Sequence, residues 1–182
     1  CVWMMPGGAR PPGGDQVMPD GSAIGSLAAG ALLRRGHRRL AFAEFGTPGH
    51  LAVRNLAFAY AAESSGADCV SLREVASHRP STPNHAEMID VADRLARRFA
   101  ETSPQPTGLF VAQTWLARVL SQALERRDIE PPANLDMVTL ASAPSELLGM
   151  ARTPIIIDES PEVVGRVALR QLLWRISHAD FE

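Results

Sequence analysis

Short apolar segments alternate with longer segments of helical periodicity along most of this chain. Mostly apolar segments of strand length occur at five places: 40–45, 68–72, 108–112, 137–141 and 154–157. In the segments between them, apolar residues recur at every third or fourth position, as they do on one face of a helix. This alternation predicts an α/β protein with a doubly wound parallel sheet, because parallel strands need a crossover, usually helical, to connect them.

The joint between the first helix and the first strand is sharply marked. Apolar residues at helical spacing favour a helix from about residue 20 to residue 35, and Asp20 can cap its free amides. Gly36 then ends the helix, because glycine readily adopts the left-handed conformation that caps the last carbonyl groups. Arg34 and Arg35 lie in the last turn, where positive charge complements the helix dipole.

Further helices are expected between the remaining strands. The clearest covers about residues 84–102, where apolar residues line one face. Another follows the turn at 46–49, and its expected apolar stripe consists of Ala52, Leu56, Ala59, Tyr60 and Glu63. The other helical segments are one built on Leu116, Val119, Leu120, Ala123 and Leu124, a short piece at 145–150, and a last helix that Pro161 opens.

The N-terminal segment has a different composition. Residues 2–5 form a short apolar run, and residues 6–14 are so rich in glycine and proline that neither a regular helix nor a central strand fits them. We interpret this segment as a strand that leaves one body, followed by a loop that enters another. The sequence begins with Cys1 and shows no signal-peptide architecture. We therefore expect a fragment of a longer protein.

The charged and sulfur-containing residues exclude several classes of protein. The eighteen basic residues are all arginine, which excludes lysine-dependent phosphate loops, Schiff bases and general bases. The net charge of -2 does not favour an extended nucleic-acid surface, and no apolar run is long enough to span a membrane. The two cysteines lack C-x-x-C spacing, so they provide neither a disulfide framework nor a zinc site.

Catalytic motifs are missing from the sequence. The histidines show neither i,i+4 spacing nor an H-E-x-x-H motif, and no G-x-S-x-G elbow follows a strand. The basic cluster at 34–39, which includes His37, has a structural role at a helix end, and we prefer that role to nucleic-acid contact. We predict a protein that is not an enzyme and has no metal or cofactor. An enzyme on a doubly wound fold is the more distant alternative.

Ligands of doubly wound sheets bind beyond the carboxyl ends of the strands. In this chain those ends are at 45–54, 112–115 and 141–145. Trp115 lies just past a strand end, where it could be core or a platform for a ligand. Arg54 could grip hydroxyl or carboxylate groups with its planar fork, or it could be a solvated surface residue. Position alone does not decide between these two interpretations of Arg54.

Several segments resemble the LacI/GalR family of bacterial transcription regulators. The most specific is the run 20–42, with its aspartate, its small residues and its Gly-His-Arg-Arg joint. Arg54 followed by Phe58 is similar to the family's Arg-x-x-Gly-Phe pattern, with Ala57 in place of the glycine. The similarity covers nearly the whole chain, because it extends to the segments 108–120, 128–138 and 154–176.

The resemblance implies a body of the periplasmic-binding-protein type I fold, in which two α/β lobes surround a cleft that binds an effector. Its cleft residues would include Arg54, which in the family commonly holds sugar hydroxyls, and Gln113 at the position of a family asparagine. The full set predicted to bind the ligand is Arg54, Gln113, Trp115, His50, Phe45 and Ser142.

Two departures from the family pattern bear on the effector. Thr114 replaces the aspartate that follows the family's asparagine, and residues 139–142 replace a glycine, an aromatic residue and a pair of aspartates. In the family, the aspartate of the pattern that residues 139–142 replace commonly accepts hydrogen bonds from sugar hydroxyls. The resemblance therefore favours an anionic or less hydroxylated effector over an ordinary hexose or pentose.

The resemblance also predicts domains and partners. Residues 1–19 would be the end of the N-terminal lobe with a crossover loop, 20–152 the C-terminal lobe, and 153–182 the strand and helix that return to the N-terminal lobe. We predict the effector-binding domain of a cytoplasmic, homodimeric LacI-type regulator with a small sugar-like effector and no membrane contact. Operator DNA would be bound through a missing N-terminal helix-turn-helix. The main alternative is a periplasmic solute-binding protein of an ABC transporter.

Overall fold

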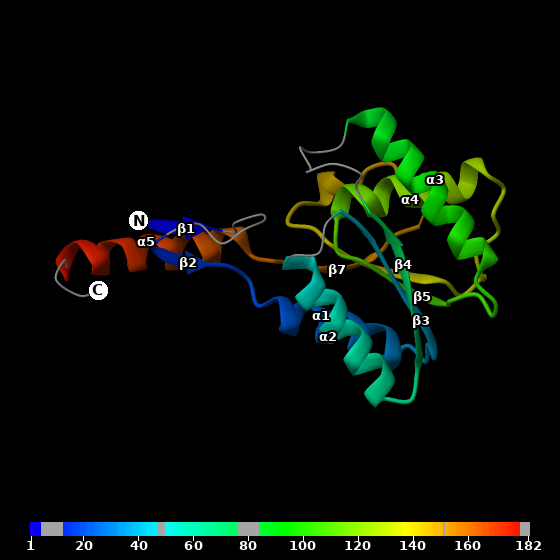
Figure 1. Ribbon diagram of the computed structural model, residues 1–182, viewed down its shortest axis with the longest axis horizontal. Helices are drawn as coiled ribbons and strands as arrows, with labels where there is room; N and C mark the ends of the chain where they lie inside the picture. Colours follow the sequence, from blue (N-terminus) through cyan, green and yellow to red (C-terminus); the bar gives the residue numbers. More distant parts are fainter. Residues whose placement is uncertain (5–12, 47–49, 76–83, 151, 179–182) are drawn as a thin grey trace. The chain divides into compact units, whose positions relative to one another are not determined.

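The computed structural model describes residues 1–4, 13–46, 50–75, 84–150 and 152–178. The chain divides into two units, one formed by Cys1–Asp20 with Glu159–Glu182 and the other by Gly21–Asp158. A five-stranded sheet forms the centre of the larger unit, and the smaller unit has a two-stranded sheet (Figure 1).

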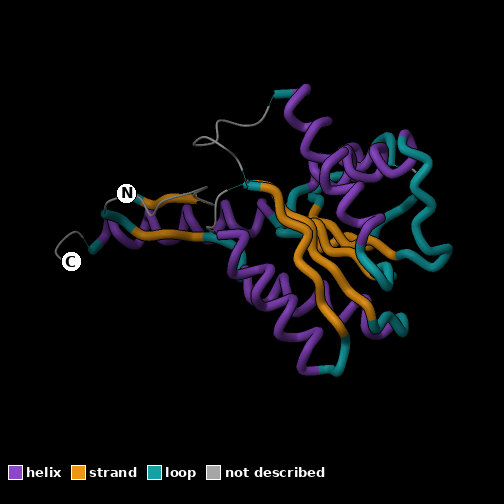
Figure 2. The backbone as a smooth tube through the Cα atoms, turned by 45° about the vertical axis from the view of Figure 1, so that its right-hand side comes forward, coloured by secondary structure: helices purple, strands orange, loops and turns teal. Residues whose placement is uncertain are grey.

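The five strands of the larger unit are all parallel, and Figure 2 shows them side by side. Their order across the sheet is β4 (Asp68–Glu74), β3 (Arg39–Phe45), β5 (Gly108–Val111), β6 (Asp136–Leu140) and β7 (Ile155–Ile157). Each lies within two residues of an apolar run in the sequence. The structure thus confirms the predicted fold class, a doubly wound α/β sheet.

Helices cover both faces of this sheet (Figure 1). α1 (Gly21–Arg34) and α2 (His50–Ser64) pack on one face, and α3 (His85–Glu101) and α4 (Thr114–Arg126) pack on the other. The first face buries Leu32, Phe42, Phe58 and Phe110, and the second buries Leu95, Phe99, Leu109 and Leu120. Because both faces are covered, the central strands are continuous apolar runs rather than alternating ones.

The buried side of α2 differs from the stripe predicted from the sequence. Leu56 and Tyr60 are exposed, whereas Phe58 is fully buried. A Cβ atom at Gly25 of α1 would lie 2.0 Å from the carbonyl oxygen of Arg54, so the two helices meet backbone to backbone. This close approach orients α2 with Phe58 inward, whereas Val53, Leu56 and Tyr60 are exposed.

The joint before β3 has the predicted structure and a further role. Gly36 adopts a φ of 89°, and the amide of His37 donates to the carbonyl of Leu32, which caps α1. The His37 ring is buried and lies 3.0 Å from the Thr107 hydroxyl through Nδ1 and 2.9 Å from the Asp136 carboxylate through Nε2. The joint therefore ties β3 to the starts of β5 and β6.

The short helical piece predicted at 145–150 is a 3₁₀ helix, η1 (Pro144–Leu147). It lies between β6 and β7, and the amides of Ser142 and Ala143 donate to Glu146 of this turn. Within the part of the chain that the structure describes, no helix is long and apolar enough to cross a membrane.

The smaller unit consists of β1 (Val2–Met4), β2 (Asp15–Val17) and helix α5 (Pro161–Ser177). The two strands pair in parallel, and α5 packs against both. β2 corrects the sequence analysis, which predicts only a crossover loop before the helix at residue 20. A three-residue polar strand carries no periodicity from which it could be recognised.

Contacts with α5 explain why β2 forms. The Asp15 carboxylate accepts hydrogen bonds from Gln171 at 2.6 Å and from two nitrogens of Arg175 at 2.6 and 2.7 Å. The Arg175 guanidinium, together with the amide of Gln171, holds the pKa of the Asp15 carboxyl well below its usual range. This strand is therefore fixed by a residue 160 positions further along the chain.

Candidate functional site

The strand order of the larger unit marks a place for a ligand. From β3 the chain crosses to β4 on one side, and then through α3 to β5 on the other side. The connections after β3 and β5 thus leave in opposite directions, and ligands of open α/β sheets bind outside the carboxyl ends of strands at such a switch point. We refer to Phe45, Gln113, Thr114, Trp115 and Ser142, which end or follow β3, β5 and β6, as the switch-point edge.

Gln113 bridges the two strands at the switch point. Its Oε1 accepts a hydrogen bond of 2.9 Å from the amide of Phe45, and its Nε2 donates one of 3.0 Å to the carbonyl of the same residue. The side chain therefore continues the ladder between β3 and β5 beyond the last paired residues. One amide proton and one oxygen lone pair of Gln113 remain for another partner.

An aromatic pair lies beside this bridge. The rings of Phe45 and Trp115 make an edge-to-face contact with centroids 6.0 Å apart and planes at 86°. Both residues are half-buried, and both pack against the core on the α3 and α4 side. Trp115, the second residue of α4, therefore packs against the core and remains partly exposed.

Thr114 and Ser142 complete the switch-point edge on the β6 side. The Thr114 hydroxyl donates a hydrogen bond of 2.5 Å to the carbonyl of Leu140, the last residue of β6. Ser142 is exposed, and its amide donates to Oε1 of Glu146 at 3.1 Å. Glu146, which the sequence analysis does not single out, therefore places an exposed carboxylate next to the strand end.

Arg54 is not the solvated surface residue that one interpretation of the sequence describes. It is 8% exposed and lies on α2, on the opposite face of the sheet from Trp115. His50 is the first residue of α2, but its side chain lies outside the described residues. Of the six predicted residues, the structure brings Phe45, Gln113 and Trp115 into direct contact and places Ser142 after the adjacent strand.

A buried carboxylate connects α2 to the end of β3. Glu44 is 7% exposed and accepts hydrogen bonds from Nδ2 of Asn55 and Nε of Arg73. Oδ1 of Asn55 is also buried, and it has no hydrogen-bond partner among the described residues. The sequence offers one signal for this cluster, because Glu44 is the single charge in an otherwise apolar run between residues 40 and 45.

A second buried carboxylate lies at the end of β4. Oε2 of Glu74 accepts from Nε of Arg94 at 2.8 Å, and its Oε1 lies 3.0 Å from Nε of Arg98. The Glu74 carboxylate raises the pKa of the Arg94 guanidinium further above its ordinary value. Arginines of β4 and α3 thus compensate both buried carboxylates, and these pairs stabilise the strand ends behind the switch-point edge.

The arrangement can stack against a small molecule and hydrogen-bond to it. Trp115 and Phe45 offer aromatic surface, while Gln113 and Ser142 offer polar atoms at the same edge. Among the described residues there is no group of three or more histidine, cysteine, aspartate or glutamate side chains that could hold a metal ion. These aromatic and polar groups can bind a small molecule by stacking and by hydrogen bonding.

Comparison with known proteins agrees with this fold. A family model described as a periplasmic binding protein-like domain matches residues 29–181. A search of curated proteins finds no match to the sequence.

Solved structures of LacI-family regulators share the fold at low sequence identity. A regulator from Rhodococcus species has a TM-score of 0.70 and 18% identity, with 89% of this chain and 57% of that chain covered. One from Silicibacter pomeroyi has a TM-score of 0.70 and 19% identity, with coverages of 100% and 52%. One from Enterococcus faecium, crystallised with bound ribose, has a TM-score of 0.70 and 19% identity, with coverages of 92% and 59%.

The chain spans between 52% and 59% of the length of these three regulators. The identities are too low to establish more than the fold, but the family model covers most of the chain. The periplasmic-binding-protein part of the resemblance seen in the sequence is thereby confirmed. The chain belongs to the family of periplasmic binding protein-like domains.

Proposed function

We propose that this chain is the effector-binding part of a LacI-type transcription regulator, and that the switch-point edge contacts the effector. The observation that carries the proposal is the cluster of Phe45, Gln113 and Trp115 at the strand switch of a binding-protein fold. The similar solved structures named as LacI regulators favour this role over that of a transporter's solute-binding protein.

The proposal assigns a role to each segment of the chain. Residues 20–152 would be the C-terminal lobe, while 1–19 and 153–182 would belong to the N-terminal lobe and the crossovers. The effector would bind against the carboxyl ends of β3, β5 and β6, with Arg54, His50 and Ser142 as further contacts. A regulator of this kind would act in the cytoplasm as a homodimer, and it would bind operator DNA through a helix-turn-helix.

The effector we propose is a small sugar-like molecule. The Enterococcus faecium regulator of similar fold contains ribose, which supports a pentose-sized ligand. Ser142 itself supplies no charged acceptor, and Oε1 of the nearby Glu146 carboxylate already accepts from the amides of Ser142 and Ala143, so we still favour a ligand with fewer hydroxyls or with an anionic group. Ribose and ribose 5-phosphate are therefore the matched neutral and anionic probes.

Calorimetry on the 182-residue chain tests this function. We expect one of the two probes to bind, and the variant Trp115→Ala to weaken that binding by roughly tenfold, because an aromatic stacking surface is lost. Tyr60→Ala is the matched control, since Tyr60 is an exposed aromatic residue on α2. Equal affinities of the wild-type chain and Trp115→Ala would contradict the site, and binding of neither probe by the wild-type chain would contradict the function.

A further inference from the structure

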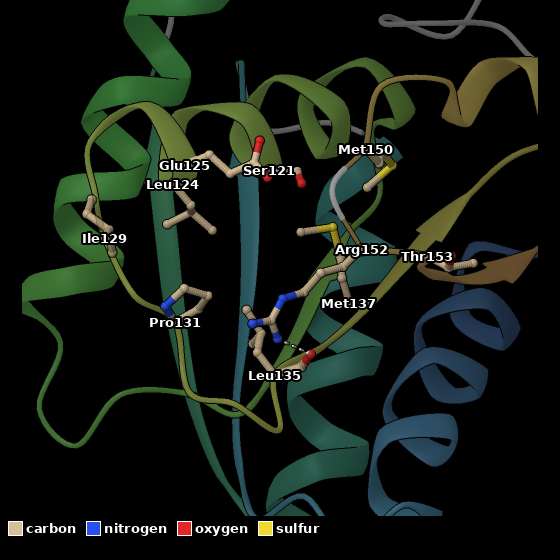
Figure 3. A pocket seen from close by; sticks show the side chains of 10 residues that line it. All are labelled: Ser121, Leu124, Glu125, Ile129, Pro131, Leu135, Met137, Met150, Arg152 and Thr153. Atoms are coloured by element: carbon tan, nitrogen blue, oxygen red, sulfur yellow. Dashed lines mark hydrogen bonds between the residues drawn. The ribbon is translucent and has the colours of Figure 1, made fainter.

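The larger unit contains a cavity of about 190 Å³ away from the switch-point edge (Figure 3). Met137, near the start of β6, forms part of its wall, whereas Ser142 of the switch-point edge follows the end of the same strand. Ser142 lies five positions after Met137, which corresponds to roughly 16 Å of extended backbone. The cavity is therefore distinct from the proposed effector site.

The walls of the cavity are apolar and come from four segments. Leu124 belongs to α4, Ile129 to the loop that follows it, Leu135 and Met137 to the start of β6, and Met150 to the segment after η1. Leu124, Leu135 and Met137 are buried residues of the core on this face of the sheet. Protein interiors are close-packed, so an open volume among core residues forgoes contacts that a ligand would restore.

Ser121 adds a hydroxyl group to the lining. The residue is 7% exposed and lines the cavity from α4. Serines in helices commonly donate to the carbonyl four residues earlier, as Ser177 of α5 does and as Ser65 does directly after α2. Ser121 makes no such bond among the described residues, so its hydroxyl can hydrogen-bond to a polar group of a ligand in the cavity.

Arg152 supplies positive charge at the cavity. Its Nη1 makes three long contacts with the carbonyls of Pro132, Ala133 and Leu135, at 3.5, 3.4 and 3.4 Å. Its hydrogen bonds to described residues all come from Nη1, and the residue is exposed. Figure 3 shows the guanidinium beside Pro131 and Leu135. Donors remain there for one carboxylate.

The wall that carries Met150 and Arg152 is anchored on both sides. Before it, Nε2 of Gln122 donates to the carbonyl of Gly149 at 3.3 Å, which ties the segment to α4. After it, β7 pairs with β6 from Ile155 onward. These contacts place Gly149 against α4 and Ile155 against β6.

We propose that this cavity binds a small aromatic monocarboxylic acid that carries a hydroxyl group, such as a hydroxybenzoate. The ring lies among the apolar walls, the carboxylate pairs with Arg152, and the hydroxyl pairs with Ser121. A cavity of about 150 Å³ is known to admit benzene, so this one has room for one substituted ring. Glu125, the other charged residue of the lining, disfavours a ligand with a second negative charge.

Methionine methyl NMR and calorimetry on the 182-residue chain test the proposal, with 3- and 4-hydroxybenzoate, benzoate and phenol as probes. We expect a hydroxybenzoate isomer to shift the methyl signals of Met137 and Met150. Arg152→Gln should weaken hydroxybenzoate binding by roughly tenfold or more, because a charge-assisted pair is lost, and it should leave phenol binding unchanged.

Two further variants keep the test specific. Ser121→Ala should weaken hydroxybenzoate several-fold, leave benzoate unchanged, and leave the urea midpoint unchanged, since the hydroxyl has no partner to lose. Arg97→Gln is the control for charge, because Arg97 is an exposed arginine of α3. The proposal is overturned if no probe shifts the two methionine signals at millimolar concentration, or if Arg152→Gln and Arg97→Gln bind hydroxybenzoate equally well. Ribose or ribose 5-phosphate binding should be the same in all three variants, which separates this site from the effector site.

Discussion

The two ends of strand β3 both carry buried polar clusters, but the clusters differ in how completely they are paired. Before the strand, both ring nitrogens of His37 have partners, and Asp136 is also paired with Arg35 at 3.2 Å. At its end, Glu44 is paired, but Oδ1 of Asn55 is buried without a partner in the described part of the chain. A fully paired cluster stabilises the fold, whereas unused hydrogen-bonding capacity is typical of a place that receives a ligand.

Among the changes that test this comparison, replacing His37 should cause the largest loss in the free energy of unfolding. His37→Ala removes both ring contacts and leaves the Thr107 hydroxyl and Asp136 without them, so we expect a loss of about 2–3 kcal/mol in the free energy of unfolding. Urea denaturation measures this loss. His85→Ala is the control, because His85 is exposed at the start of α3. A loss no larger than that of the control would show that the cluster is not the anchor we describe.

Gln113→Ala should have a smaller effect on stability and an additional effect on function. The variant loses the two hydrogen bonds to the Phe45 backbone, which we expect to cost about 1–2 kcal/mol in urea denaturation. It should also weaken effector binding, because the bridge positions the rings of the switch-point edge. Gln105→Ala, at a half-buried loop residue, is the matched control. A stability loss with unchanged effector affinity would restrict Gln113 to a structural role.

The loss of stability in acid that comes from the cluster before β3 should be smaller than the effects of the two substitutions above. Hydrogen bonds from His37 and then Arg35 lower the pKa of the Asp136 carboxyl. A carboxyl whose pKa is lowered by folding stabilises the protein above the unfolded value of about 4, and this contribution is lost as the pH falls through the folded-state pKa. We expect the urea midpoint of the wild type to fall more steeply below about pH 4 than that of Asp136→Asn. The same slope in both proteins would contradict this assignment, and Asp68→Asn, at an exposed residue, serves as the control.

The smallest effect concerns the cysteine thiols. Cys69 lies opposite Leu40 in the sheet, and burial raises the pKa of its thiol to about 11. At pH 8 we expect a thiol reagent to label Cys69 at least tenfold more slowly than the exposed Cys1, with no change when effector is added. Equal labelling rates would indicate that the sheet opens readily at the amino ends of β3 and β4. That result would contradict our inference that the paired cluster before β3 stabilises the fold.

The fold of the larger unit could be predicted because its signals are local. Each strand is an apolar run bounded by turn residues, and Gly36 ends α1 where its conformational freedom is needed. The buried side of α2 could not be predicted, because it depends on the approach of Gly25 to a different helix. β2 was missed for a related reason, since its stability comes from Arg175 on α5.

The position of the candidate site could be predicted from the sequence, but the contacts among its residues could not. Carboxyl ends of adjacent parallel strands must lie together, which explains why Phe45, Gln113 and Trp115 meet. That the amide of Gln113 closes on the backbone of Phe45 depends on a rotamer that no sequence pattern specifies. Glu44 could have been noticed as a charge within an apolar run, but its partners come from two other elements.

The contact at Gly25 offers a way to change the geometry of the larger unit by a substitution outside the candidate site. An alanine there would bring its Cβ to 2.0 Å from the Arg54 carbonyl oxygen, so α1 and α2 would have to move apart. Arg54 and Asn55 would travel with α2, and the geometry around the end of β3 would change without any substitution among the residues that face a ligand. Adaptation to a new effector could therefore start with the spacing between two helices, before any contact residue has changed.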